Sequence, residues 1–235
     1  MNTTGQLDGT AVRRLGLGAV LLVSWLVATT ATPVRAAPHQ LRGAPQASSL
    51  GSASQQGRAV GQPVLARTAI LTAVSGIVLV KLPTSARFTP LTGSTAIPFG
   101  SSVDAIGQGG VNGVVRVTTA TATSGGTQSG LFYGGRFRLT QSPSGVTTMA
   151  LTMPLRCPSS TARFLGAIAS GRFTTKGRLA AASVVGTTRL THWVTVDTCQ
   201  ATAINVAIAG SIRVDDFTQH RVVVVHAPGR YVAGT

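Results

Sequence analysis

The sequence contains no glutamate and only five aspartates, against twenty lysines and arginines, which gives a formal net charge of +15 at pH 7. Hydrolytic enzymes commonly need a carboxyl group beside the reacting bond, and a glycosidase needs two that face one sugar ring. Beyond residue 36 the acids are Asp104, Asp197, Asp215 and Asp216. Because Asp215 and Asp216 are adjacent and precede a polar segment, we expect them to form a turn rather than a catalytic pair.

Other motifs of common enzymes and cofactor sites are also missing. There is no G-x-S-x-G motif, and Gly107-Gln108-Gly109-Gly110 precedes neither a lysine nor a helical pattern. His220 and His226 would lie about 20 Å apart along a strand, too far to share a metal ion. His192 is expected on a strand surface. We therefore predict a protein that is not an enzyme and has no cofactor, no metal site and no catalytic residue.

Aromatic residues make up 5% of the chain and charged residues 11%, whereas valine, threonine, alanine and glycine are abundant. This composition favours strands joined by glycine-rich turns. We predict an all-β fold, an antiparallel β-sandwich or roll of many short strands. No stretch after Val27 has a clear helical pattern, and residues 162–169 have room for one short turn at most. The expected strands are residues 77–81, 87–91, 102–106, 114–119, 128–133, 136–141, 147–153, 172–175, 179–184, 188–197, 203–209, 212–215 and 222–226.

Several turns and strand faces follow from local chemistry. Gly134-Gly135 between two apolar runs predicts a two-residue hairpin, because glycine tolerates positive φ, and residues 142–145 predict a second turn. In the strand that follows Gly135, Phe137 and Leu139 alternate with Arg136 and Arg138, so we expect the arginines to face solvent without a partner. The valine-rich run at 222–225 predicts that the C-terminus pairs into the sheet.

The two cysteines, Cys157 and Cys199, are predicted to form one disulfide, because we expect the chain to be exported and extracellular proteins keep such bonds. Neither a C-x-x-C spacing nor an adjacent histidine indicates a redox or metal role. The expected bridge is structural.

The N-terminus predicts export. Residues 1–36 contain Arg13 and Arg14, an apolar run over residues 15–31 and small residues before Ala37, which is typical of a signal peptide. The alternative is a membrane anchor that is not cleaved. Residues 37–67 are rich in alanine, proline, serine, glutamine and glycine and are expected to be a disordered linker. The β domain is expected to span residues 68–235, and the protein to be secreted or associated with the cell envelope.

The basic charge belongs to the predicted mature protein. Removing residues 1–36 takes away three arginines and one aspartate, which leaves a net charge of +13. Such a surface attracts anionic cell-wall polymers, acidic polysaccharides or lipid headgroups; the alternative is a solvated surface without any partner. We expect no specific nucleic-acid binding, because the arginines are scattered from Arg58 to Arg230 and not clustered with aromatic residues.

The order of the apolar blocks and the placing of both cysteines resemble a FecR-like extracellular domain of secreted actinobacterial proteins. The blocks are GIVLVKLP at 76–83, FTPL at 88–91, IPFGSSVD at 97–104, GVVRVT at 113–118, FYGGRF at 132–137, LTMPLRC at 151–157, GRFTTKGR at 171–178, WVTVDTC at 193–199, GSIRV at 210–214, VVVV at 222–225 and GRY at 229–231. FecR itself is a sensor arm that relays a ligand signal through a membrane anchor to a sigma factor. The resemblance implies an all-β fold and an extracellular location, but it identifies no binding residues. Our first hypothesis is a non-enzymatic extracellular binding or structural module, and the alternative is a membrane-anchored FecR-like sensor accessory.

Overall fold

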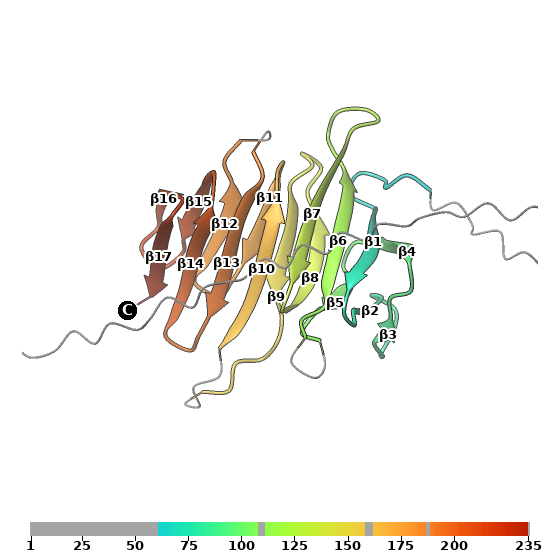
Figure 1. Ribbon diagram of the computed structural model, residues 1–235, viewed down its shortest axis with the longest axis horizontal. Helices are drawn as coiled ribbons and strands as arrows, with labels where there is room; N and C mark the ends of the chain where they lie inside the picture. The colour runs from blue at the N-terminus through green and yellow to red at the C-terminus, as the bar shows by residue number, and fades with distance from the viewer. Residues whose placement is uncertain (1–60, 108–110, 158–161, 187–188, 235) are drawn as a thin grey trace, which may run out of the picture. The chain divides into compact units, whose positions relative to one another are not determined.

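The computed structural model describes residues 61–107, 111–157, 162–186 and 189–234, which belong to one compact unit. All regular structure in these ranges is β-strand, and seventeen strands form two sheets (Figure 1). The all-β prediction is therefore confirmed. The predicted signal peptide and most of the predicted linker lie outside the described residues. Within the described ranges, no helix has the length and apolarity that a bilayer crossing requires.

The first sheet has eight strands. In spatial order they are β17 (Gly229–Gly234), β14 (Ala201–Ile208), β13 (Thr191–Asp197), β10 (Arg163–Ala169), β7 (Thr127–Tyr133), β6 (Val114–Ala120), β1 (Thr68–Ser75) and β4 (Ser94–Pro98). Every pairing in this sheet is antiparallel.

The second sheet has nine strands. In spatial order they are β16 (Arg221–His226), β15 (Ser211–Asp216), β12 (Ala180–Val184), β11 (Phe173–Lys176), β9 (Thr147–Leu151), β8 (Arg136–Gln141), β5 (Ser102–Asp104), β2 (Leu79–Lys81) and β3 (Thr89–Pro90). The β9–β11 pairing is parallel, which departs from the purely antiparallel expectation. It arises because the chain visits the first sheet as β10 between these two strands.

The chain alternates between the two sheets as it advances. Apart from a local exchange at the start of each sheet, the spatial order of the strands follows their order in the sequence. Figure 1 shows this as a continuous colour change from cyan at β1 to red at β16 and β17. Successive strand pairs therefore lie in alternate sheets. The core extends between these two layers.

The core contains the inward residues of both sheets, and its largest members are Trp193, Phe132, Phe137 and Phe173. Phe132 of the first sheet packs against Phe137 and Phe173 of the second, with ring centroids 6.2 and 5.6 Å apart. The Trp193 Nε1–H donates a 2.8 Å hydrogen bond to the Thr175 hydroxyl of the opposite sheet. Because a buried indole N–H needs an acceptor, this bond fixes how the two layers face each other.

The hairpin predicted at Gly134-Gly135 was wrong, and residues 162–169 do not form the short turn that the sequence allowed. Gly134-Gly135 is no hairpin turn, because β7 belongs to the first sheet and β8 to the second. The segment crosses between layers beneath Phe164: a Cβ on Gly134 would lie 2.1 Å from the Phe164 ring, and one on Gly135 2.2 Å from its carbonyl oxygen. Residues 162–169 form no helical turn, because Leu165, Ala167 and Ala169 alternate into the core along β10.

The turn at residues 142–145 joins β8 to β9 as predicted, with a hydrogen bond from the Gly145 N–H to the Ser142 carbonyl. The C-terminus is also paired as expected: β16 pairs with β15 and β17 with β14. The strand list omitted β1, β4, β10 and β17. At the other end of the domain, Pro63 is buried and the Ala66 N–H bonds the Gln141 side chain, so packing extends N-terminal to Thr68.

Candidate functional site

The outward face of the second sheet carries most of its charge. We call it the basic face, and the cations at outward positions of its strands are Lys81, Arg136, Arg138, Lys176 and Arg213. The exposed Arg172, which directly precedes β11, lines the same face beside Thr174 and Arg213. For each strand cation the neighbours along the strand point into the core, as Phe137 and Leu139 do on either side of Arg138. Because side chains alternate along a strand, burial of the apolar neighbours places these five cations on one surface.

Two of the five cations are neutralised locally. Arg136 binds Asp104 with an N–O distance of 2.6 Å, and Arg213 binds Asp215 at 2.9 Å. The prediction that Arg136 has no partner was therefore wrong. The arginine and its acid lie on paired strands, since Asp104 of β5 is in register with Arg136 of β8, and the sequence alone does not show that register. Lys81, Arg138 and Lys176 form no ion pair with any of the described residues.

These three cations lie in one line across the strands. Lys81 is in register with Ser102, Ser102 with Arg138, Arg138 with Ala150, and Ala150 with Lys176. Neighbouring strands are about 4.8 Å apart, so successive cations are separated by about 10 Å at the backbone. We call Lys81, Arg138 and Lys176 the cation row.

An aromatic ring lies at each end of the cation row. The Lys81 ammonium is 5.6 Å from the centre of the Phe88 ring, which the Arg136 guanidinium also contacts at 4.9 Å. The Lys176 ammonium is 5.3 Å from the centre of the Phe217 ring, and Phe217 is 39% exposed. These contacts hold the flexible lysine side chains against the surface by cation–π attraction.

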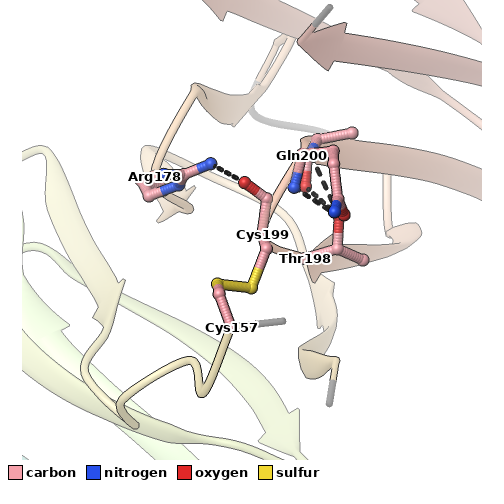
Figure 2. The surroundings of a disulfide bond; sticks show 6 residues. Cys157, Arg178, Thr198, Cys199 and Gln200 are labelled. Atoms are coloured by element: carbon pink, nitrogen blue, oxygen red, sulfur yellow. Dashed lines mark hydrogen bonds between the residues drawn. A yellow bond between two sulfur atoms is a disulfide. The ribbon is translucent and has the colours of Figure 1, made fainter. Parts of the chain in front are cut away.

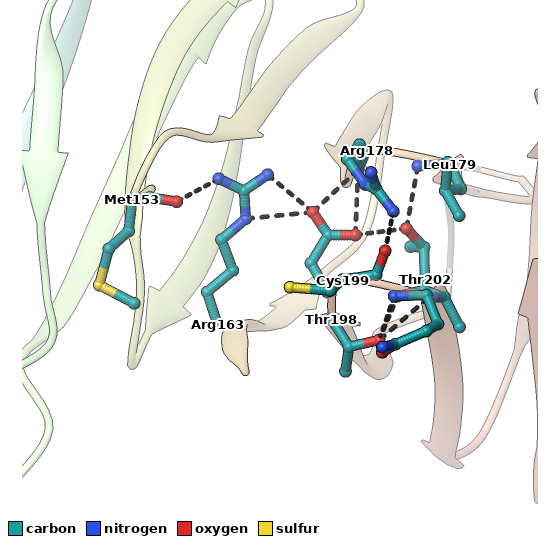
Figure 3. Close-up of polar contacts among 10 residues, drawn as sticks. Met153, Arg163, Arg178, Leu179, Thr198, Cys199 and Thr202 are labelled. Atoms are coloured by element: carbon teal, nitrogen blue, oxygen red, sulfur yellow. Dashed lines mark hydrogen bonds and ion pairs between the residues drawn. The ribbon is translucent and has the colours of Figure 1, made fainter. Parts of the chain in front are cut away.

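A second polar centre is buried and has a structural role. The Asp197 side chain has no solvent exposure and forms an ion pair with Arg163 at 2.7 Å. It also accepts hydrogen bonds from the Arg178 N–H and the Thr202 hydroxyl. Figure 3 shows Arg163 directed at this carboxylate and at the Met153 carbonyl oxygen, while Thr202 also accepts from the Leu179 N–H. Both oxygens of the Asp197 carboxylate accept hydrogen bonds from neighbouring segments. Asp197 therefore anchors four segments, which are β13, β10, the β11–β12 turn and β14, and it is no candidate acid or base.

The disulfide lies beside this centre. Cys157 and Cys199 are bonded with a Cα–Cα distance of 6.0 Å, which confirms the predicted pair (Figure 2). Cys157 follows β9, and Cys199 lies in the turn between β13 and β14. The Arg178 guanidinium donates to the Cys199 carbonyl, as Figure 2 also shows. The bridge and the Asp197 network therefore fasten the same turn to the second sheet.

The predicted turn at Asp215 and Asp216 was wrong in detail, because both residues end strand β15. Their side chains point to opposite faces, and the buried Asp216 accepts hydrogen bonds from the Thr218 N–H, the Gln219 N–H and the Tyr231 hydroxyl. Burial by itself would raise the pKa of Asp216, but these hydrogen bonds outweigh it and lower the pKa to about 2. Burial and the bond to Asp216 raise the pKa of Tyr231.

This geometry predicts that the contact between Asp216 of β15 and Tyr231 of β17 is sensitive to acid. A carboxylate whose pKa is lowered on folding stabilises the protein above its unfolded pKa, near 4, and loses that stabilisation as the pH falls toward 2. Between pH 5 and pH 2, the wild type is expected to lose about 1 kcal/mol more unfolding free energy than Asp216→Asn. Urea denaturation at several pH values measures this difference. Parallel pH profiles would contradict the assignment, since every other carboxylate is common to both proteins.

The described histidines, His192, His220 and His226, do not form a shared site. His192 lies on the outer surface of β13, and its Nε2 is 2.7 Å from the Tyr133 hydroxyl. The Tyr133 ring lies over Gly166, where a Cβ would come within 2.1 Å of it. His226 lies at the end of β16, 2.7 Å from the Ser211 hydroxyl, and His220 lies in the turn before that strand. No group of three or more histidines, cysteines or acids among the described residues could hold a metal ion.

No protein-family model, curated protein or solved structure matches the chain. The functional proposal therefore rests on the residues and geometry of this chain. Alternation along each strand could have identified Lys81, Arg138 and Lys176 as outward residues, but their alignment depends on the register between strands that are distant in the sequence.

Proposed function

We propose that the domain is a non-enzymatic, extracellular module that binds anionic polymers of the cell surface. The observation that carries the proposal is the basic face, where five strand cations oppose two carboxylates that are already paired. Three of these strand cations, and Arg172 beside them, are then left without an ion pair among the described residues. A surface with this charge attracts polyanions and repels cations. Binding of this kind requires no catalytic group.

The state of the acids supports binding over catalysis. Among the described residues, Asp104, Asp197 and Asp215 each form an ion pair with an arginine. Asp216 accepts hydrogen bonds from its own turn and from Tyr231. A general acid or base must be free to exchange a proton with substrate, and none of these four carboxylates is placed for that.

The location outside the cytoplasm belongs to the same proposal. A disulfide is compatible with an oxidising compartment, and the signal-like residues 1–36 would direct the chain there. The FecR-like resemblance favours the same location. The sensor alternative requires that residues 15–31 stay attached as an anchor. Intact mass of the exported protein separates the two, since a mature start near Ala37 excludes the anchor.

The binding proposal is tested by titrating the exported protein against hyaluronan, a polyglycerol phosphate and neutral dextran at 50 and 200 mM salt. Charge-driven binding is screened over a Debye length of about 8 Å at physiological ionic strength, so affinity for both acidic polymers should fall steeply with salt while dextran does not bind. Tight binding to dextran that does not depend on salt, or no binding to either acidic polymer, would contradict the proposal.

A further inference from the structure

We infer that the cation row of Lys81, Arg138 and Lys176 is the binding site for an extended acidic glycan with one carboxylate per disaccharide. The bound glycan would lie across the strands of the second sheet. This inference rests on the proposed function and names its surface and its class of ligand. Three features of the basic face carry it: the interval between the cations, the residues between and beside them, and the aromatic rings at both ends.

The interval matches a glycan whose charges are widely spaced. Successive members of the row lie on every second strand, about 10 Å apart at the backbone, and the backbone positions of the whole row span about 19 Å. This interval is close to the length of one disaccharide in an extended chain. A polymer with a charge on every small unit, such as polyphosphate, would place several anions in each interval and leave most of them without a cation.

The positions between the cations leave room for a chain. Ser102 lies between Lys81 and Arg138, and Ala150 lies between Arg138 and Lys176. Both side chains are small and only partly exposed. A polymer can therefore approach the sheet closely between its charged contacts, where a larger side chain would hold it away.

A row of hydroxyls runs beside the cation row. It lies two residues further along the strands, at a distance of about 7 Å, and its members are Thr140, Thr148, Thr174 and Ser183, each in register with the next. Thr174 and Ser183 already share a 2.8 Å hydrogen bond. Hydroxyls both donate and accept hydrogen bonds, which suits the hydroxyl groups of a sugar ring.

The aromatic residues favour a glycan over a nucleic acid. Proteins that bind single-stranded nucleic acid stack successive bases on aromatic side chains along the binding groove. On the basic face, Phe88 and Phe217 lie near Lys81 and Lys176 at opposite ends of the row, and Ser102 and Ala150 occupy the positions between. Two end rings can pack against the apolar faces of two sugar units, but they offer no stacking site for each base of a strand.

The test compares two variants that lose the same charge. The row variant carries Lys81→Gln, Arg138→Gln and Lys176→Gln. The control variant carries Arg67→Gln, Arg116→Gln and Arg230→Gln, which are exposed and lie outside the basic face, two of them on the first sheet. Binding of wild type and both variants to hyaluronan, polyphosphate and a single-stranded oligonucleotide is measured against salt, with melting temperatures as the check on folding.

We expect the row variant to lose hyaluronan affinity about tenfold or more at low salt, with a shallower dependence on salt because fewer counterions are displaced, while the control variant keeps wild-type affinity. The single variant Arg138→Gln, at an exposed side chain in the middle of the row, should show a smaller loss in the same direction. Equal losses in the two triple variants would show that the cation row is not the binding site, while general polyanion binding would stand. Tighter binding of the wild type to polyphosphate or to the oligonucleotide would contradict an acidic glycan as the ligand. No binding to any polyanion would refute the proposed function as well.

Discussion

Asp197→Asn is expected to lower the free energy of unfolding by about 3–5 kcal/mol. The Asp197 side chain is fully buried and faces the guanidinium of Arg163, whose side chain is 12% exposed. Asparagine keeps the shape but removes the charge, so the buried guanidinium is left without a counter-charge. Its desolvation cost is then no longer offset, and the segments that meet at Asp197 lose their common acceptor.

Asp215→Asn is the matched control, because it removes the same unit of charge from an exposed pair. The side chains of Arg213 and Asp215 are 55% and 35% exposed, and exposed ion pairs contribute about 0–1 kcal/mol. Urea denaturation of both variants gives the comparison, and the double variant Arg163→Met/Asp197→Asn should recover part of the loss by removing the orphaned cation. Equal, small effects in the two single variants would show that Asp197 is no anchor.

Loss of the Cys157–Cys199 bond is expected to lower the free energy of unfolding by about 4 kcal/mol, from the entropy of the loop that the bond closes. The two cysteines are 42 residues apart in the sequence. The loop contains β10 to β13, which supply strands to both sheets. Without the bond the unfolded chain gains conformations, while the folded chain keeps its hydrogen bonds.

The measurement is thermal unfolding of the oxidised protein, the reduced protein and Cys157→Ser/Cys199→Ser. For a domain of this size, the melting temperature should fall by about 10 °C, equally on reduction and in the double variant. Reducing agent should leave the double variant unchanged. Two thiols that react in the native, unreduced protein would contradict the bond, and an unchanged melting temperature would contradict its contribution.

Alternation and turn chemistry predicted much of the second sheet. Phe137 and Leu139 point into the core with Arg136 and Arg138 outside, because the period of a strand is two residues and burial of the apolar set decides its orientation. Strand β10 was missed because its alanine and glycine content blurs the contrast between faces. The Gly134-Gly135 step was misassigned for a related reason, since a short glycine turn looks the same whether it joins paired strands or crosses between sheets.

By itself, the sequence determined the fold class, the disulfide, the outward direction of Arg138 and the excess of cations over acids. Each depends on composition or on neighbours along the chain. Only the tertiary structure decided that Asp104 neutralises Arg136, that Asp197 is an anchor, and that Lys81, Arg138 and Lys176 form one line. These facts depend on the register between paired strands that are separated by other segments of the chain, and register is set by how both sheets bury their apolar faces together.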